Sequence, residues 1–262
     1  MSSPQRIVIG HSVEGRPIEA WASESAPIHT LIIGGFHGDE PATIRLVEEF
    51  EIDDPGVALL PVLNPDGAML CSRYNARGVD LNRNFGFNWH IESVEPAGAG
   101  PWSEPESRAL RDFVVARAPA KIVSLHWALG EIDADGEQST QLAEAMWAAL
   151  HEEERRPYRL RVTVLGRGQR RLAKIYVECP GSMGQWAGYQ LLYPDNSRPA
   201  MITLELPYNG AESRTDPLPH DHFASVCERW KRDAEGYLRE VRPSVVKMLN
   251  AACAFLVSQR PA

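Results

Sequence analysis

The stretch His29-Thr30-Leu31-Ile32-Ile33-Gly34-Gly35 decides the fold. Its apolar, β-branched centre ends in two glycines, which is typical of a buried strand followed by a loop. Residues 41–50 then begin with proline and carry apolar side chains at helical spacing, which predicts a short helix. Residues 56–63 read as a second buried strand. This strand-helix-strand order predicts an α/β fold.

The same alternation continues along the chain. We expect a turn at 64–67, a long surface loop at 86–105, helices at 103–116 and 140–150, strands at 121–126 and 201–206, and a closing helix at 245–256. No internal repeat or linker divides the 262 residues, which suffice for one substantial core. We therefore predict a single domain over residues 1–262, built as a three-layer α/β/α sandwich with a mixed, mostly parallel twisted sheet.

The charge balance argues against two classes of partner. The chain has 27 basic and 35 acidic side chains, so its net charge is 27 − 35 = −8. This charge repels nucleic acid and anionic membranes. We find neither a signal-peptide pattern nor an apolar run long enough to span a membrane, and we expect a cytoplasmic protein. The four cysteines show no C-x-x-C pairing, so we expect them to be reduced. A homodimer remains open.

Two metal-competent side chains follow the first strand directly. His37 and Glu40 lie three residues apart in the loop after it, and His126 ends another predicted strand. Because open α/β sheets place their sites at the carboxyl ends of strands, we expect the three to meet. Two histidines and one carboxylate form a ligand set of catalytic zinc sites, with one position left for water. Residues 37–40 taken alone allow a structural alternative. In it, the histidine and the glutamate at the start of the helix hydrogen-bond to backbone groups or to solvent.

A carboxylate also lies inside an apolar strand, in Thr203-Leu204-Glu205-Leu206-Pro207. Burial raises the pKa of a carboxyl group toward the range useful for a general base at neutral pH. Glu205 is therefore our candidate base. The alternative is an inward glutamate paired with an arginine.

One segment resembles a known family. Residues 73–85, Arg-Tyr-Asn-Ala-Arg-Gly-Val-Asp-Leu-Asn-Arg-Asn-Phe, follow Asn-Pro-Asp-Gly at 64–67 and resemble the zinc carboxypeptidases over most of residues 30–210. The resemblance implies a phosphorylase/hydrolase-like fold and one zinc ion per chain, held by His37, Glu40 and His126, with Glu205 as base. The alternative for residues 73–85 is a solvated polar loop with capping asparagines.

The resemblance also implies roles around the metal. Arg73 would polarise the scissile carbonyl, and Asp80 would orient His37 by accepting its remaining N–H. Asn82 and Arg83 would grip the terminal carboxylate of a small peptide that enters carboxylate end first, since a guanidinium matches a carboxylate with two parallel hydrogen bonds.

Tyr176 aligns with the substrate-contacting tyrosine of the family, and a core tyrosine is the equally weighted alternative. Residues 155–174 contain eight basic side chains. We expect a solvated or edge-protecting face there, with contacts to the carboxylates of an anionic peptide as the alternative.

Residues 180–186, Pro-Gly-Ser-Met-Gly-Gln-Trp, resemble the murein peptide amidase branch of the family. That branch cleaves the bond between γ-D-glutamate and meso-diaminopimelate in cell-wall peptides recycled in the cytosol. Residues 127–130, Trp-Ala-Leu-Gly, depart from the acidic residue and proline expected there. Two alternatives are a zinc deacylase of N-acyl amino acids, of the aspartoacylase and succinylglutamate desuccinylase group, and a non-catalytic zinc- or partner-binding module descended from the enzyme.

Overall fold

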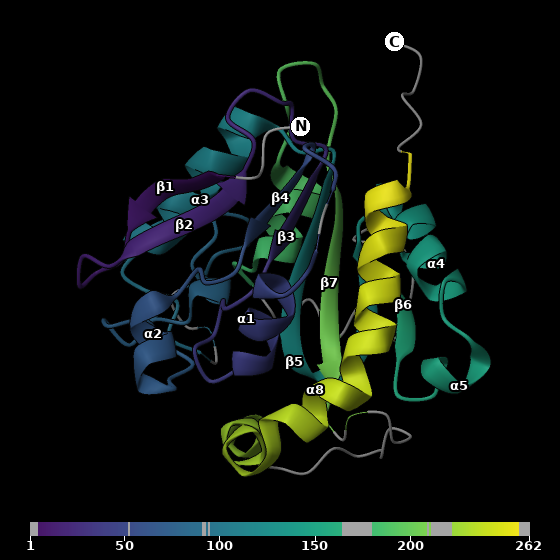
Figure 1. The fold of residues 1–262 in the computed structure, drawn as a ribbon. Coiled ribbons are helices and arrows are strands. Elements are labelled where there is room, and N and C mark those ends of the chain that lie inside the picture. Colours follow the sequence, from purple (N-terminus) through teal and green to yellow (C-terminus); the bar gives the residue numbers. More distant parts are fainter. Residues whose placement is uncertain are drawn as a thin grey trace.

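The computed structural model describes residues 5–51, 53–90, 93, 95–163, 180–208, 210 and 222–256 (Figure 1). The strands are β1 (Gln5–His11), β2 (Pro17–Ala22), β3 (Thr30–Ile33), β4 (Val57–Leu60), β5 (Lys121–Asp135), β6 (Arg159–Thr163) and β7 (Ala200–Pro207). The α-helices are α1 (Pro41–Glu48), α2 (Pro65–Leu70), α3 (Pro105–Arg117), α4 (Thr140–Ala148), α5 (Glu152–Arg155), α7 (Met183–Gln185) and α8 (His222–Ala254). Short 3-10 turns span Leu81–Arg83 (η1) and Glu137–Ser139 (η2), and a π-helical turn spans Trp186–Gln190 (η3).

These strands form one mixed sheet. The order is β1-β2-β4-β3-β5-β6, with β7 paired to β5. The β1–β2 and β2–β4 pairs are antiparallel, whereas β3 runs parallel to both β4 and β5. The carboxyl ends of β3, β4 and the first half of β5 therefore lie at one edge of the sheet, where sites of open α/β sheets are found.

Strand β5 reverses direction in its middle, and β7 occupies the space between its two halves. The β7 register runs in parallel from Lys121↔Ala200 to Ala128↔Pro207, and then the partner numbers reverse, from Glu131↔Glu205 to Asp135↔Met201. The reversal falls at Gly130, whose φ of 63° suits glycine. Each residue near the end of β7 is thus flanked by both halves of β5.

Helices cover both faces of this sheet. One buried apolar cluster joins the sheet to α1, α4 and α8, and a second joins it to α3, α7 and η3. The alternation of side chains along β5 places Val123, Leu125 and Trp127 in the first cluster, so Ser124 and His126 point to the opposite face. The predicted three-layer α/β/α sandwich is confirmed.

Several local predictions need correction. Residues 64–67 begin a helix instead of a turn, because the side chain of Asn64 accepts the N–H of Gly67 and caps α2. The closing helix α8 begins far earlier than residue 245, and the strands β1 and β2 were not predicted. The strand β6 lies in the basic segment 155–174, where an edge-protecting face is expected, and it is the last strand in the sheet order. Cys71 forms a disulfide bond, so the expectation of four reduced cysteines is wrong. No helix within the described ranges is long and apolar enough to cross a membrane.

We predict that Gly130→Ala destabilises the protein more than a change of backbone preference explains. A Cβ at Gly130 would lie 2.3 Å from the carbonyl oxygen of Pro157. Gly15, with φ of 79°, has no neighbour within 4 Å of its Cβ position and is the matched control. We expect Gly15→Ala to lower the free energy of unfolding by about 1 kcal/mol and Gly130→Ala by about 3 kcal/mol. Urea unfolding measures both, and equal losses would contradict the steric argument.

Candidate active site

The loop after β3 carries His37 and Glu40 to the carboxyl edge of the sheet. It is anchored by close contact with the start of α2: a Cβ at Gly38 would lie 1.9 Å from the carbonyl carbon of Gly67. The N–H of Gly38 also donates to the carbonyl oxygen of Ser72, at 2.9 Å. The Asn-Pro-Asp-Gly segment thus packs against the loop that carries His37 and Glu40. Only glycine at position 38 permits so close an approach.

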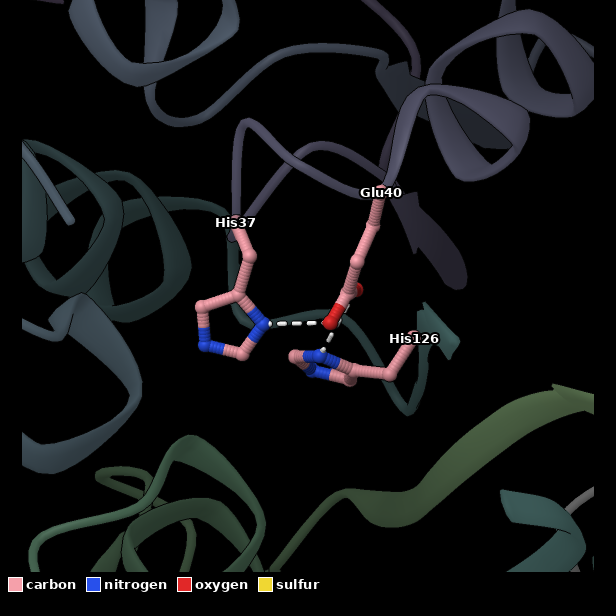
Figure 2. A group of neighbouring side chains, drawn as sticks. All are labelled: His37, Glu40 and His126. Carbon is pink, nitrogen blue, oxygen red and sulfur yellow. Dashed lines mark hydrogen bonds and ion pairs between the residues drawn. The ribbon is translucent and has the colours of Figure 1, made fainter. Parts of the chain in front are cut away.

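His37, Glu40 and His126 point toward one another (Figure 2). Nδ1 of His37 lies 2.7 Å from Oε1 of Glu40, and Nδ1 of His126 lies 3.5 Å from Oε2 of Glu40. One potential ligand atom from each residue falls within 4.8 Å of the others, and all three side chains are buried. This set could hold a metal ion.

The donor chemistry fits a cation at this position. Oε2 of Glu40 is buried and has no hydrogen bond among the described residues. Burial raises the pKa of Glu40, but His37 and His126 outweigh burial and lower that pKa to about 2. Glu40 is therefore a buried carboxylate anion whose second oxygen is free to accept a metal, as such sites require.

A second contact orients each histidine. Nε2 of His37 lies 3.1 Å from Oδ1 of Asp80, and Nε2 of His126 lies 3.0 Å from Oγ of Ser124. With Nε2 occupied in both rings, Nδ1 is the nitrogen turned toward Glu40. The contact expected between Asp80 and His37 is present, and the one to Ser124 adds to it.

Arg73 lies against the same aspartate, with its Nη2 3.0 Å from Oδ2 of Asp80. Its Nε donates to Oδ2 of Asp80 at 3.1 Å, and its Nη1 lies 3.4 Å from Nδ1 of His37 and 3.8 Å from Oε1 of Glu40. Burial opposes ionisation of Asp80, but Arg73 and then His37 hold its pKa well below the usual value. A fixed positive charge thus lies beside the three metal-competent side chains.

The loop that carries Arg73 is organised by a buried asparagine. Oδ1 of Asn75 accepts the backbone N–H groups of Arg77 and Val79, each at 3.0 Å. Its Nδ2 donates to Oε2 of Glu104 in α3's N-terminal region, at 2.8 Å. The asparagine of the Arg-Tyr-Asn segment therefore shapes the backbone instead of facing the site.

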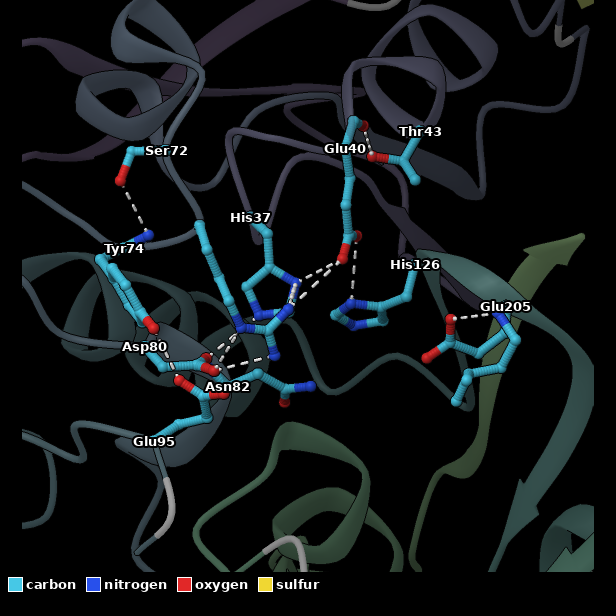
Figure 3. Close-up of polar contacts among 12 residues, drawn as sticks. His37, Glu40, Thr43, Ser72, Tyr74, Asp80, Asn82, Glu95, His126 and Glu205 are labelled. Atoms are coloured by element: carbon cyan, nitrogen blue, oxygen red, sulfur yellow. Dashed lines mark hydrogen bonds and ion pairs between the residues drawn. The ribbon is translucent and has the colours of Figure 1, made fainter. Parts of the chain in front are cut away.

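Asn82 and Arg83 lie in η1, next to the aspartate that contacts His37. The N–H of Met183 donates to Oδ1 of Asn82 at 2.9 Å, which leaves the amide Nδ2 as the end that can donate elsewhere. The guanidinium of Arg83 donates to the backbone oxygen of Asn82, at 2.8 Å. Figure 3 shows Asn82 on the side of Asp80 that faces the metal-competent group.

Glu205 lies directly beside His126. The two residues are partners in the β5–β7 register, and the alternation of both strands points their side chains to the same face. Burial, followed by repulsion from Glu40 and Glu131, raises the pKa of Glu205 to about 8. The N–H of Leu129 donates to Oε2 of Glu205 at 3.4 Å. No arginine contact to Glu205 occurs within the described parts of the chain, so the ion-paired alternative finds no support there.

Two predicted features extend beyond the described residues. Tyr176 and residues 164–174 of the basic segment lie outside them. Within the described part of that segment, Arg161 pairs with Glu131 at 2.7 Å. The Arg155 guanidinium lies 5.4 Å from the centre of the Trp147 ring. These two arginines therefore serve intramolecular contacts.

Two polar features near the site were not predicted. Ser124 lies two residues before His126, and this spacing places it on the same face of β5. Glu131, Asp133 and Asp135 alternate along the second half of β5, all buried. Oγ1 of Thr203 donates to Oδ2 of Asp135 at 2.8 Å. The alternation of side chains along β5 could have predicted the position of Ser124. No local pattern in the sequence indicates that the acidic second half of β5 lies next to β7.

The fold and the site together define a metallohydrolase: a buried two-histidine, one-carboxylate set at the carboxyl edge of an α/β sheet, with a carboxyl group of raised pKa beside it. Residues 2–225 match the sequence profile of the zinc carboxypeptidases. The chain belongs to the zinc carboxypeptidase family and is a hydrolase of the metallopeptidase type.

Individual relatives agree. Murein peptide amidase A of Escherichia coli (strain K12) is 30% identical over 199 residues, which cover 68% of this chain and 74% of that one. The corresponding protein of Vibrio campbellii (strain ATCC BAA-1116) is 28% identical over 222 residues, covering 76% of this chain and 77% of the relative.

Solved structures have the same fold. The crystal structure of murein-tripeptide amidase from Escherichia coli O157 aligns with a TM-score of 0.58 and 25% identity, covering 94% of this chain and 93% of that one. Carboxypeptidase A from Helicoverpa armigera aligns with a TM-score of 0.63 at 20% identity, covering 96% and 69% of the two chains.

We predict that Asp135→Asn stabilises the protein at alkaline pH. Burial, followed by repulsion from Asp133, raises the pKa of Asp135 well above its usual value of 3.8, while the bond from Thr203 opposes the shift. Between these pKa values the folded state binds a proton that the unfolded chain releases. The contribution of Asp135 is therefore most favourable below its ordinary pKa of 3.8, and it is lost as the pH rises toward the raised pKa of the folded state. An asparagine still accepts the Thr203 hydroxyl but cannot ionise.

The prediction for Asp135→Asn is tested by the midpoint of thermal unfolding, measured for the variant and the parent protein from pH 4.5 to pH 8. The gain of Asp135→Asn over the parent protein should grow with pH. Asp53→Asn removes the same charge at an exposed position and should show no such trend. A gain that is the same at every pH would contradict the assignment.

Proposed function

We propose that this chain is a zinc-dependent peptide amidase that hydrolyses the γ-D-glutamyl–meso-diaminopimelate bond of small cell-wall peptides. The observation that carries the proposal is the pairing of Glu205 with His126, because it sets a carboxyl group of raised pKa beside the metal-competent set. The names of the amidase relatives support the substrate. Their coverage of most of the chain supports an activity of the whole chain.

His37, Glu40 and His126 would hold the zinc ion. Zinc bound there supplies a Lewis acid that polarises a carbonyl and lowers the pKa of water. The carboxylate oxygen Oε2 of Glu40, buried without a hydrogen bond, supports this ligand set. Asp80 contacts Nε2 of His37, and Ser124 contacts Nε2 of His126, which keeps Nδ1 of each imidazole turned toward Glu40.

Glu205 would act as the general base and then as the general acid. It accepts a proton from the attacking water and passes it to the nitrogen of the leaving amine, so that the amine departs neutral. A carboxylate with an ordinary pKa would be a weak base for the first transfer, and burial raises the pKa of Glu205 and strengthens it as a base. The N–H of Leu129 steadies its Oε2.

Arg73, Asn82 and Arg83 would bind the substrate. Arg73 carries the fixed positive charge next to the site and would stabilise the negative charge that develops on the scissile carbonyl oxygen. The amide Nδ2 of Asn82 and the guanidinium of Arg83 would receive the terminal carboxylate of the leaving residue. Arg73 binds Asp80, and Arg83 is near enough to Asp80 to lower its pKa, so both cations adjoin the aspartate that contacts His37. Their position supports entry of the peptide carboxylate end first.

We further propose that the chain acts as one catalytic domain in the cytoplasm, where cell-wall peptides are recycled, without nucleic acid or membrane partners. The net charge of −8 supports the last point. A homodimer is compatible with this proposal, and the site draws every described residue from one chain.

We predict that the zinc-loaded protein hydrolyses L-Ala-γ-D-Glu-meso-diaminopimelate and releases free diaminopimelate, which mass spectrometry detects. The matched comparison is the same tripeptide with an α-linked glutamate, together with an N-succinyl and an N-acetyl amino acid. We expect kcat/KM to be at least tenfold higher for the γ-linked tripeptide. Faster turnover of the N-acyl amino acids would instead identify a deacylase, and no turnover of any compound would favour a non-catalytic module.

We predict that Glu205→Gln abolishes hydrolysis while zinc stays bound. The amide has the shape of the carboxyl group but cannot accept the proton, so kcat should fall by a factor of at least about 10². Zinc per chain, measured by atomic emission after dialysis, should not change. Glu137→Gln, in η2, is a control for loss of a glutamate charge. Near-normal kcat in Glu205→Gln would refute the assigned base.

A further inference from the structure

The carbonyl oxygen of Pro207 receives three hydrogen bonds at the end of β7. The hydroxyl of Tyr237 donates at 2.8 Å, the indole N–H of Trp127 at 3.2 Å, and the backbone N–H of Gly210 at 3.4 Å. Trp127 and Tyr237 are almost fully buried. Two buried side chains from distant parts of the chain thus converge on one backbone atom, two residues beyond Glu205.

The two donors also pack on each other. The rings of Trp127 and Tyr237 lie 4.3 Å apart, centre to centre, and Trp230 meets Trp127 edge-on at 6.5 Å. Tyr237 and Trp230 belong to α8, whereas Trp127 belongs to β5. We call Trp127, Pro207 and Tyr237 the strand-end clamp. It joins α8, β5 and β7 on the face of the sheet opposite to the metal-competent set.

Two residues of the strand-end clamp lie close in sequence to His126 and Glu205. Trp127 follows His126 directly, and the alternation of β5 turns the indole to one face and the imidazole to the other. Pro207 lies two residues beyond Glu205. Leu129 is a partner of Pro207 in the β5–β7 register and also donates its N–H to Glu205, so a shift of the Pro207 end of β7 relative to β5 would alter this bond.

We propose that Trp127 and Tyr237 are positioning residues that hold the end of β7 and thereby fix the Glu205 carboxylate relative to His126. The inference rests on the proposed function of Glu205 as the base. It also gives a role to Trp127, where the sequence departs from the pattern expected after the third metal-competent residue. The tryptophan supplies a fixed donor that a carboxylate or a proline at this position could not provide.

Tyr237→Phe tests the proposal, since it removes one hydroxyl and keeps the ring. Tyr193→Phe is a closely matched control: its hydroxyl donates at 2.9 Å to the carbonyl oxygen of Pro119, just before β5, at the opposite end of the sheet. Both changes delete a buried bond from a tyrosine to a proline carbonyl. Both should lower the midpoint of thermal unfolding by a similar amount.

The two variants should differ in catalysis. We expect Tyr237→Phe to lower kcat by about fivefold to tenfold, with KM and zinc content unchanged, because only the positioning of the base is loosened. Tyr193→Phe should keep the parental kcat. Equal kcat losses in both variants, or parental kcat in Tyr237→Phe, would overturn the proposal.

Hydrogen exchange gives a readout that needs no substrate. Amides of Ala200–Tyr208 should exchange faster in Tyr237→Phe than in Tyr193→Phe, and unchanged exchange would also reject the clamp. If Tyr237→Phe does not fold, Trp127→Phe tests the other donor by the same measurements. Kinetics use whichever compound of the substrate panel is hydrolysed, so a wrong substrate assignment does not decide the outcome. If the parent protein hydrolyses none of these compounds, the proposed function fails. The strand-end clamp is then tested by hydrogen exchange alone.

Discussion

The pairing of β7 with β5 is the contact on which the rest of the site depends. It places Glu205 opposite His126, and the alternation of both strands turns both side chains to the same face. If this register shifted by one residue, the side chain of Glu205 would point into the apolar layer under α8, and Leu204 would face the site in its place. The apolar residues that alternate with Glu205 oppose such a shift, because they fill the core on the other face.

Charge explains why this arrangement is stable enough to exist. Glu40 and Asp80 are buried, and the partly buried Glu205 is close enough to Glu40 to be repelled by it. Carboxylates in such surroundings repel one another unless cations or protons compensate. Arg73 and His37 compensate the first two, so Glu40 and Asp80 keep their charge. Around Glu205, burial and repulsion from Glu40 and Glu131 outweigh the opposing effect of His37, so the pKa of Glu205 is raised instead. The same physical rule thus produces two carboxylates with low pKa values and one carboxyl group with a high pKa.

Much of this could be read from local patterns. The strand before His37, the helix at Pro41 and the inward glutamate at 205 follow from alternation, spacing and capping rules. The same rules predicted a strand only over residues 121–126, and they could not show that β5 continues to Asp135 and reverses at Gly130, because the acidic residues 131–135 carry no local signal of pairing with β7. They also misread Asn64, since the side-chain bond that closes a turn is the bond that caps a helix. Contacts such as Tyr237 to Pro207 join residues far apart and leave no trace in either segment.

The reversal of β5 affects the order in which the protein can fold. The two halves of β5 are adjacent in the chain, yet they cannot pair with each other in the native sheet, because β7 separates them. β7 lies more than 60 residues downstream and must enter a gap held open between them. Non-local pairings of this kind form slowly. The metal-competent residues His37, Glu40 and His126 all precede β7 in the chain, so they are synthesised before the strand that brings Glu205 beside His126.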